Sequence, residues 1–159
     1  NNESPAQALM RVVREGGGSI AGASMQEGDI VNFLRWNYTS ICSDGSNGGH
    51  PRGYGAFARV LGRYVREQKI MPLETTVYKM TGLTAEHLGI QGRGMIMPGY
   101  FADLVLLDPS AVIDNSTFAN PTALSTGIEI VWVNGKIVYK DKQPTHEHPG
   151  VFINRPSEN

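Results

Sequence analysis

The sequence predicts an α/β segment followed by an all-β segment, with a boundary near residue 90. Residues 1–90 alternate between amphipathic helical patterns and short apolar runs joined by short links, which is typical of a parallel α/β sheet. From Gly89 onward, glycines and prolines punctuate the chain. Two apolar runs in this second part are joined by Asn134-Gly135, a strong signal for a β-hairpin.

Composition limits the functions that the chain can have. With 159 residues, 40% apolar and 18% charged, it has the length and composition of a soluble globular protein with a real core. A net charge of −1 without a basic cluster argues against a nucleic acid or an anionic membrane as partner. No apolar run approaches the roughly 20 residues that span a bilayer. The single cysteine, Cys42, cannot form an internal disulfide, and we expect it to be a small buried residue.

The first third of the chain predicts two helices and a short strand. Ser4 as N-cap and Pro5 at the first helical position predict a helix ending at Glu15. Residues 19–23 form a weak strand candidate. A capping box of Ser24 and Glu27 predicts a helix over residues 25–36, which would bury Ile30, Val31 and Leu34.

Three further helices are expected before residue 90. The strongest covers residues 54–67, with an apolar face and a solvated face; the apolar face comprises Phe57, Val60, Leu61 and Tyr64, and the solvated face Arg59, Arg63 and Arg66. A helix from Pro72 to about Gly82 would bury Val77 and Met80. Thr84 is predicted to cap a short helix over residues 85–88.

Strands dominate the prediction for the second part of the chain. Apolar and alternating runs predict strands over residues 102–108, 128–133, 136–140 and 151–153. Residues 114–126 are polar and predict a loop.

The stretch from Tyr38 to Tyr54 carries the chemistry that the sequence suggests. A short apolar run over residues 39–43 predicts a buried strand that ends at Asp44, followed by a glycine-rich loop and His50-Pro51-Arg52. A carboxylate at the carboxyl end of a buried strand is where α/β proteins place chemistry. Pro51 stiffens the loop before Arg52, and a fixed guanidinium suits two-pronged recognition of a carboxylate. An Asp-Gly pair also forms ordinary turns, so these residues alone leave both interpretations open.

Other candidate ligands are weaker. His146-Glu147-His148 has the alternation of a metal site, but no third ligand lies nearby. His87 is expected at a helix surface, and Asp103 and Asp108 at solvated strand ends. Neither a Gly-Lys-Ser/Thr nor a Gly-x-Gly-x-x-Gly motif opens a helix, which disfavours a phosphate-binding loop.

A series of motifs resembles the C-terminal half of the D-aminoacylases, the N-acyl-D-amino-acid deacylases of the amidohydrolase superfamily. The series runs over essentially the whole chain, in order and at family spacing. It comprises Ser43-Asp44-Gly45, His50-Pro51-Arg52, the run at 54–67, residues 79–86, Arg93-Gly94, residues 98–104, Gly127-Ile128 and Val133-Asn134-Gly135. Thr84 departs from the family, which usually has Pro there.

The resemblance implies the C-terminal part of a (β/α)8 (TIM-like) barrel over residues 1–90 and the C-terminal part of a small β-sandwich over residues 91–159. It also implies a zinc enzyme that hydrolyses N-acyl-D-amino acids. Asp44 matches the catalytic aspartate, expected to act as base toward the metal-bound water and then as proton donor to the leaving amine. Asp44 is also a weak candidate metal ligand. Arg52 matches the arginine that grips the substrate's carboxylate, and His50 is a weaker substrate-binding candidate.

The same resemblance predicts what this chain does not hold. The family's other metal ligands, a His-x-His pair, a cysteine and further histidines, come from earlier strands, so we expect the chain to begin mid-protein and the Zn2+ ligands to lie in an N-terminal portion. The remainder of the same enzyme would then be a partner, and the fragment alone would be inactive. Two alternatives stay open: a cyclic amide or imide hydrolase of the superfamily, and an inert binding module. A cytoplasmic location is expected.

Overall fold

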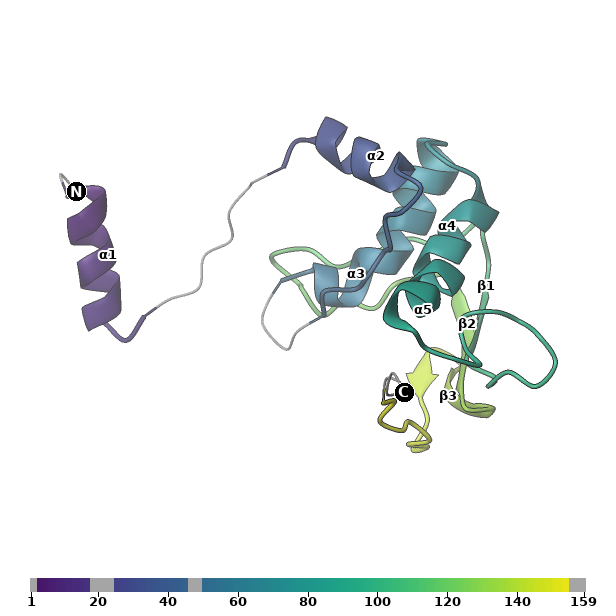
Figure 1. Ribbon diagram of the computed structural model, residues 1–159. Coiled ribbons are helices and arrows are strands. Elements are labelled where there is room, and N and C mark those ends of the chain that lie inside the picture. The colour runs from purple at the N-terminus through teal and green to yellow at the C-terminus, as the bar shows by residue number, and fades with distance from the viewer. Residues whose placement is uncertain (1–2, 18–24, 46–49, 155–159) are drawn as a thin grey trace, which may run out of the picture. The chain divides into compact units, whose positions relative to one another are not determined.

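The computed structural model describes residues 3–17, 25–45 and 50–154. The chain divides into two compact units, residues 1–30 and 31–159, and each is described by itself. The elements (Figure 1) are α1 (Pro5–Arg14), α2 (Glu27–Arg35), α3 (Arg52–Arg59), η1 (Val60–Glu67), α4 (Leu73–Met80), α5 (Gly82–Leu88), β1 (Leu104–Leu107), β2 (Ile128–Val133), β3 (Lys136–Lys140) and β4 (Gln143–Pro144).

Helix α1 begins as predicted. The Ser4 hydroxyl accepts from the Gln7 N–H, and the Gln7 side chain accepts from the Ser4 N–H, which completes a capping box. The apolar face of α1 is exposed, with Leu9, Met10 and Val13 each more than half accessible.

Helix α2 confirms the predicted second helix within two residues at its start. The predicted Ser24 cap and the strand candidate over residues 19–23 lie outside the described residues. The Asp29 carboxylate instead accepts from the Gln26 N–H. Of its three predicted inward residues, Leu34 is fully buried, whereas Ile30 and Val31 are half-buried.

The predicted strand over residues 39–43 is wrong: this segment is not paired in a sheet. A strand needs neighbouring strands to bond its backbone groups. In the described part of the chain, the Ile41 N–H bonds the Lys79 carbonyl of α4, at 3.2 Å. Without a second layer on its other face, Cys42 is exposed, which corrects its predicted burial, whereas Ile41 points inward and is buried.

The predicted long helix forms as α3 followed by the π-helical η1. The wider turn ends with the Gln68 N–H bonding the Arg63 carbonyl, five residues earlier. Val60, Leu61 and Tyr64 are buried as predicted, but Phe57 is 40% exposed.

Helix α4 buries a face that only partly matches the predicted one. Val77 is 40% exposed, whereas Thr76 and Lys79 are buried, and Met80 packs at the edge of the core. Thr84 does not cap a helix. It lies inside α5, and its hydroxyl donates to the Lys79 carbonyl at 2.8 Å.

The sheet is antiparallel, with strand order β1-β2-β3-β4. Strand β1 is shorter than predicted, and β2 and β3 have the predicted bounds. Positive φ at Asn134 (48°) and Gly135 (79°) makes the tight turn that Asn-Gly predicted. The predicted strand over residues 151–153 is wrong; the described last strand is β4, which pairs with β3, and proline-flanked residues 151–153 lie beyond it.

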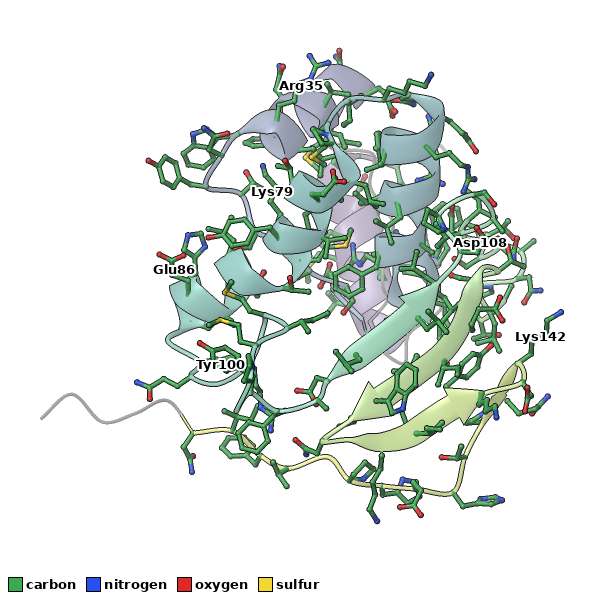
Figure 2. All side chains as sticks on the ribbon, turned by 90° about the vertical axis from the view of Figure 1, so that its right-hand side faces the viewer. Arg35, Lys79, Glu86, Tyr100, Asp108 and Lys142 are labelled. Atoms are coloured by element: carbon green, nitrogen blue, oxygen red, sulfur yellow. The ribbon has the colours of Figure 1, made fainter. Side chains whose placement is uncertain are left out.

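One core joins the helices to the sheet within residues 31–159 (Figure 2). Ala58 and Leu61 pack with Val112, which is 1% exposed, and the cluster is completed by Leu73, Met80, Leu107 and Ile128. Because residues from both sides of residue 90 share this core, the helical and β parts fold against each other. The division into a barrel part and a sandwich part stays a prediction. No described helix is long and apolar enough to cross a membrane.

Candidate functional site

Asp44 and Arg52 lie together at the start of α3, as predicted. Arg52 Nε is 2.8 Å from Asp44 Oδ2. Asp44 has a φ of 45°, a left-handed conformation that Asp tolerates better than most residues. Both side chains are about half or more exposed, so this ion pair stabilises the fold by at most about 1 kcal/mol. A competing carboxylate could therefore displace Asp44 from the guanidinium at little cost.

His50 is part of the same turn. Its Nδ1 accepts from the Arg52 N–H at 3.2 Å, so the imidazole lies against the first turn of α3. The imidazole ring also meets the Phe118 ring edge-on, with centroids 5.2 Å apart. The structure thus brings all three predicted site residues into one cluster.

The loop over residues 114–126 packs on this cluster, a contact that the sequence did not reveal. Arg59 Nη1 lies 3.1 Å from Asp114 Oδ2, and the Asp114 side chain is 10% exposed. Partial burial acts to lower the pKa of Arg59, but the hydrogen bonds and charges of Asp114 and Tyr64 together outweigh it, and the pKa is raised. Arg66 donates to the Val112 and Pro109 carbonyls. The prediction that Arg59 and Arg66 only face solvent is therefore wrong.

Lys79 is a buried cation that sequence reasoning missed. It is 2% exposed, and its Nζ donates to the Leu34 and Trp36 carbonyls at 2.6 and 2.5 Å. These carbonyls close the C-terminal end of α2, where a cation is favoured. Desolvation lowers the pKa of Lys79. A lysine two turns along an amphipathic helix normally predicts a solvated residue, so no local pattern marks Lys79 as buried.

Asp103 is not a solvated strand end. Its carboxylate accepts from Arg93 Nη1 and from the Asn134 N–H at 2.8 Å. Arg93 Nη2 donates to the Asn134 side chain at 2.7 Å, and its guanidinium stacks on the Phe101 ring, 4.2 Å from the centroid. This cluster ties the segment before β1 to the β2–β3 turn and has no link to Asp44.

The remaining histidines form no ligand cluster. His87 Nδ1 lies 2.9 Å from the Ser40 hydroxyl, at the helix end where it was predicted. Glu147, between His146 and His148, pairs with Lys136 at 3.0 Å. Within the described ranges, no three His, Cys, Asp or Glu residues come together as a metal site. The residues present therefore do not by themselves fit a zinc ion.

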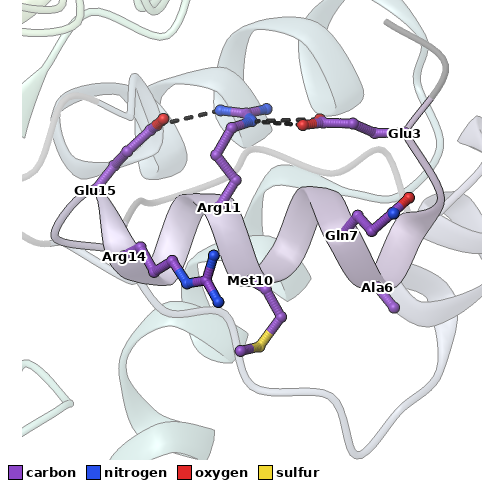
Figure 3. Close-up of a pocket in the computed structure, with 7 residues that line it drawn as sticks. All are labelled: Glu3, Ala6, Gln7, Met10, Arg11, Arg14 and Glu15. Carbon is purple, nitrogen blue, oxygen red and sulfur yellow. Dashed lines mark hydrogen bonds and ion pairs between the residues drawn. The ribbon is translucent and has the colours of Figure 1, made fainter.

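A shallow hollow of about 710 Å³ lies along α1. One helix face forms it, and Figure 3 shows Arg11 lying between Glu3 and Glu15, with ion pairs of 3.2 and 3.1 Å. It holds none of the predicted site residues.

Comparison with known proteins identifies the family. The model of a family described as "Amidohydrolase family" matches residues 39–139, which include the Asp44–Arg52 cluster and the hairpin. The chain belongs to the amidohydrolase family.

The curated relatives of this amidohydrolase include deacylases. It is 46% identical over 134 residues to D-aminoacylase of Alcaligenes xylosoxydans xylosoxydans, which covers 82% of this chain and 28% of the relative. N-acyl-D-aspartate deacylase of the same organism is 43% identical, over 81% of this chain and 26% of the relative. The match confirms the predicted resemblance. The amidohydrolase chain spans about a quarter of the length of these relatives.

Solved structures agree. A D-aminoacylase described as having a binuclear metal centre superposes with a TM-score of 0.76 at 47% identity, covering 79% of this chain and 27% of that one. N-acyl-D-glutamate deacylase from Bordetella bronchiseptica, complexed with zinc and a phosphonate inhibitor, gives 0.58 at 48% identity, covering 62% and 20%. These neighbours hold metal ions, and this amidohydrolase shares their fold over the matched part.

Proposed function

We propose that this amidohydrolase chain supplies the acid/base carboxylate and the substrate-binding arginine of an N-acyl-D-amino-acid deacylase. The observation that carries the proposal is the Asp44–Arg52 pair at 2.8 Å, held within a segment that matches the deacylases. The guanidinium already holds a carboxylate, which is the group that an N-acyl-amino acid presents.

Each residue has one task in this proposal. Arg52 binds the α-carboxylate of the substrate and orients the amide. Once the substrate's carboxylate replaces it on Arg52, Asp44 takes a proton from the attacking water and passes it to the leaving amine. His50 borders the same site.

A divalent metal ion, zinc in the simplest case, would polarise the scissile carbonyl in such an enzyme. Because the described residues bring no three ligands together, we propose that its ligands come from outside this chain. The chain alone is then inactive, and its partner is the remainder of the same enzyme. The cytoplasmic location stays a prediction.

A chimera tests the proposal: this chain joined to the portion of the A. xylosoxydans D-aminoacylase that the match does not cover. We expect the chimera to release D-amino acids from N-acyl-D-amino acids. Asp44→Asn should lower kcat by about 10² to 10⁴, because a positioned acid/base group is lost. Asp141→Asn, at an exposed position whose φ of 54° Asn tolerates, is the matched control. Full turnover by the Asp44→Asn chimera would rule out the assigned role.

Arg52→Ala separates deacylation from hydrolysis of cyclic amides or imides. A charge-assisted hydrogen bond contributes about 1.5–3 kcal/mol, so KM for N-acyl-D-amino acids should rise about 10- to 100-fold. Neutral cyclic imides lack the carboxylate and should be insensitive to the change. Arg14→Ala, in exposed helix α1, is the matched control. Equal effects of Arg52→Ala on both substrate classes would favour the cyclic-amide alternative.

A further inference from the structure

Two hydroxyl groups of the 114–126 loop hold the backbone on both sides of Arg52. The Ser116 hydroxyl donates to the Pro51 carbonyl at 2.8 Å, and the Ser125 hydroxyl donates to the Tyr54 carbonyl at 3.0 Å. Ser116 is 8% exposed, so water cannot readily replace its bond. Both bonds reach more than 60 positions along the chain, so they fix this turn against a distant segment.

The contact between the loop and α3 is tight enough to require a glycine. Gly55 is buried, and a Cβ placed there would lie 2.9 Å from the Asp114 Cβ and closer still to the Ser116 hydroxyl. The Asp114 carboxylate then pairs with Arg59 one turn further along α3. The loop therefore docks along the whole first turn and a half of the helix that carries Arg52.

Phe118, in the same loop, contacts His50, which precedes Arg52 in the chain. Its ring meets the His50 ring edge-on at 5.2 Å, an arrangement favoured between aromatic rings. His50 in turn accepts from the Arg52 N–H. The loop thus bonds the residue before Arg52 and a residue after it, and it contacts Arg52 indirectly through the His50 ring.

We propose that the 114–126 loop is a positioning element that fixes Arg52 for the substrate's carboxylate. This inference rests on the proposed function of Arg52. A guanidinium on a long side chain reaches a defined place only if its backbone is fixed, and small displacements at a binding group cost much of its effect. Ser116 and Gly55 are positioning residues in this account, since neither touches the substrate.

Ser116→Ala in the chimera tests the proposal kinetically. Losing one hydrogen bond should raise KM for an N-acyl-D-amino acid about 3- to 10-fold, with kcat little changed. The corresponding N-acyl-D-amino-acid amide has no carboxylate for Arg52, and its kcat/KM should stay the same. The matched control is Thr145→Val, one residue after β4, which removes a hydroxyl that donates to the Ile137 carbonyl at the same 2.8 Å.

The outcomes separate this inference from the function on which it rests. If the unaltered chimera does not hydrolyse N-acyl-D-amino acids, the proposed function fails. If it does, and Ser116→Ala leaves KM unchanged or weakens acid and amide substrates equally, the positioning role fails.

Hydrogen exchange on the full 159-residue chain gives a second readout that does not need an active chimera. The N–H groups of Gly53 and Tyr54 bond the His50 and Pro51 carbonyls within the turn that the loop holds. Ser116→Ala and Gly55→Ala should both speed exchange at residues 53–56, whereas Thr145→Val should not. Because Ser116→Ala removes the atom nearest to the added methyl, the two changes together should have less effect than the sum of each. Unchanged exchange at residues 53–56 in both single variants would overturn the inference.

Discussion

Lys79 shows how one buried residue can organise a segment that has no regular structure. Its Nζ bonds the Leu34 and Trp36 carbonyls, and its own carbonyl accepts from the Ile41 N–H. The side chain and the backbone of one residue therefore fix the end of α2 and the segment that leads to Asp44. The side chain, labelled in Figure 2, is 2% exposed, and its Nζ donates two hydrogen bonds that offset the cost of burying a cation.

Lys79→Met should destabilise the chain by about 1–3 kcal/mol, because the buried Leu34 carbonyl loses its donor while the methylene packing is kept. Urea unfolding measures the change as a shift in midpoint. Lys140→Met, at an exposed position at the end of β3, is the matched control and should shift it little. A midpoint for Lys79→Met equal to that of the control would show that the two hydrogen bonds contribute nothing net.

The lowered pKa of Lys79 also predicts a pH dependence. Desolvation disfavours the charged form in the folded chain, whereas the unfolded chain titrates near the ordinary lysine value of 10.5. Between the folded pKa and 10.5, the unfolded state binds more protons, so the folded state gains stability as pH rises. The stability difference between the unaltered chain and Lys79→Met should therefore widen as pH rises toward 10.5. Urea unfolding across that range tests this, and a difference that narrows would contradict it.

The sequence could predict that Asp44, His50 and Arg52 lie close together, but not which distant residues hold them there. Asp44, His50 and Arg52 fall within nine positions, so a short turn is enough to bring them together, and local motifs reveal it. Lys79 and Ser116 bond carbonyls 43 and 65 residues away. No local pattern marks such partners, because any backbone carbonyl can accept and every residue has one.

Whether a predicted strand forms depends on where its partner strand lies in the sequence. Strands β2 and β3 pair with each other across a two-residue turn, and the Asn134-Gly135 pair is enough to predict that turn. The run over residues 39–43 has the composition of a strand, but no described strand pairs with it. Composition predicts that a residue suits a strand, but a strand forms only where neighbouring strands can pair with it.

The turn after β1 predicts a local acid dependence. The Ser110 hydroxyl and N–H donate to the Asp108 carboxylate at 2.7 and 2.8 Å, and these bonds lower the pKa of Asp108 below its ordinary 3.8. A lowered carboxyl pKa contributes stability above 3.8 that is lost as pH falls through the folded value. Ser110→Ala should raise the pKa of Asp108 toward 3.8, measured by NMR titration of its carboxyl carbon. Thr145→Val, which removes a hydroxyl that donates to the Ile137 carbonyl, is the matched control and should leave the pKa of Asp108 unchanged.

Across the whole molecule, Gly62 is where the helices meet the β part. A Cβ at Gly62 would lie 2.5 Å from both the Val112 carbonyl and the Ile113 side chain. Arg66, one turn later on η1, donates to the same Val112 carbonyl. The helix and the Val112 backbone can approach this closely only because position 62 has no side chain.

Gly62→Ala should therefore destabilise the chain by about 1–3 kcal/mol through overpacking, although alanine favours a helix. Gly28→Ala is the matched control: Gly28 lies within α2 and has open space around it, so the change should stabilise by up to about 1 kcal/mol. Opposite shifts of the two urea midpoints are the expected result. Shifts of the same sign would show that helix propensity, and not the close contact with Val112 and Ile113, decides the effect at position 62.

This chain spans about a quarter of the length of its relatives. The proposed site residues lie together, but the described residues bring no three metal ligands together. Many large apolar side chains of the chain are exposed to solvent, among them Ile96 and Phe152, each about 90% accessible.

The isolated chain should therefore bind zinc weakly. One carboxylate, already paired with Arg52, cannot replace three or four protein ligands, so we expect no binding tighter than micromolar in titration calorimetry. The chimera should bind zinc tightly, and Asp44→Asn should change that affinity less than it changes kcat. The His146-Glu147-His148 segment offers the contrary outcome: tight binding by the isolated chain that His146→Ala with His148→Ala abolishes. That result would move the metal to the C-terminal segment and contradict the assignment of its ligands to the rest of the enzyme.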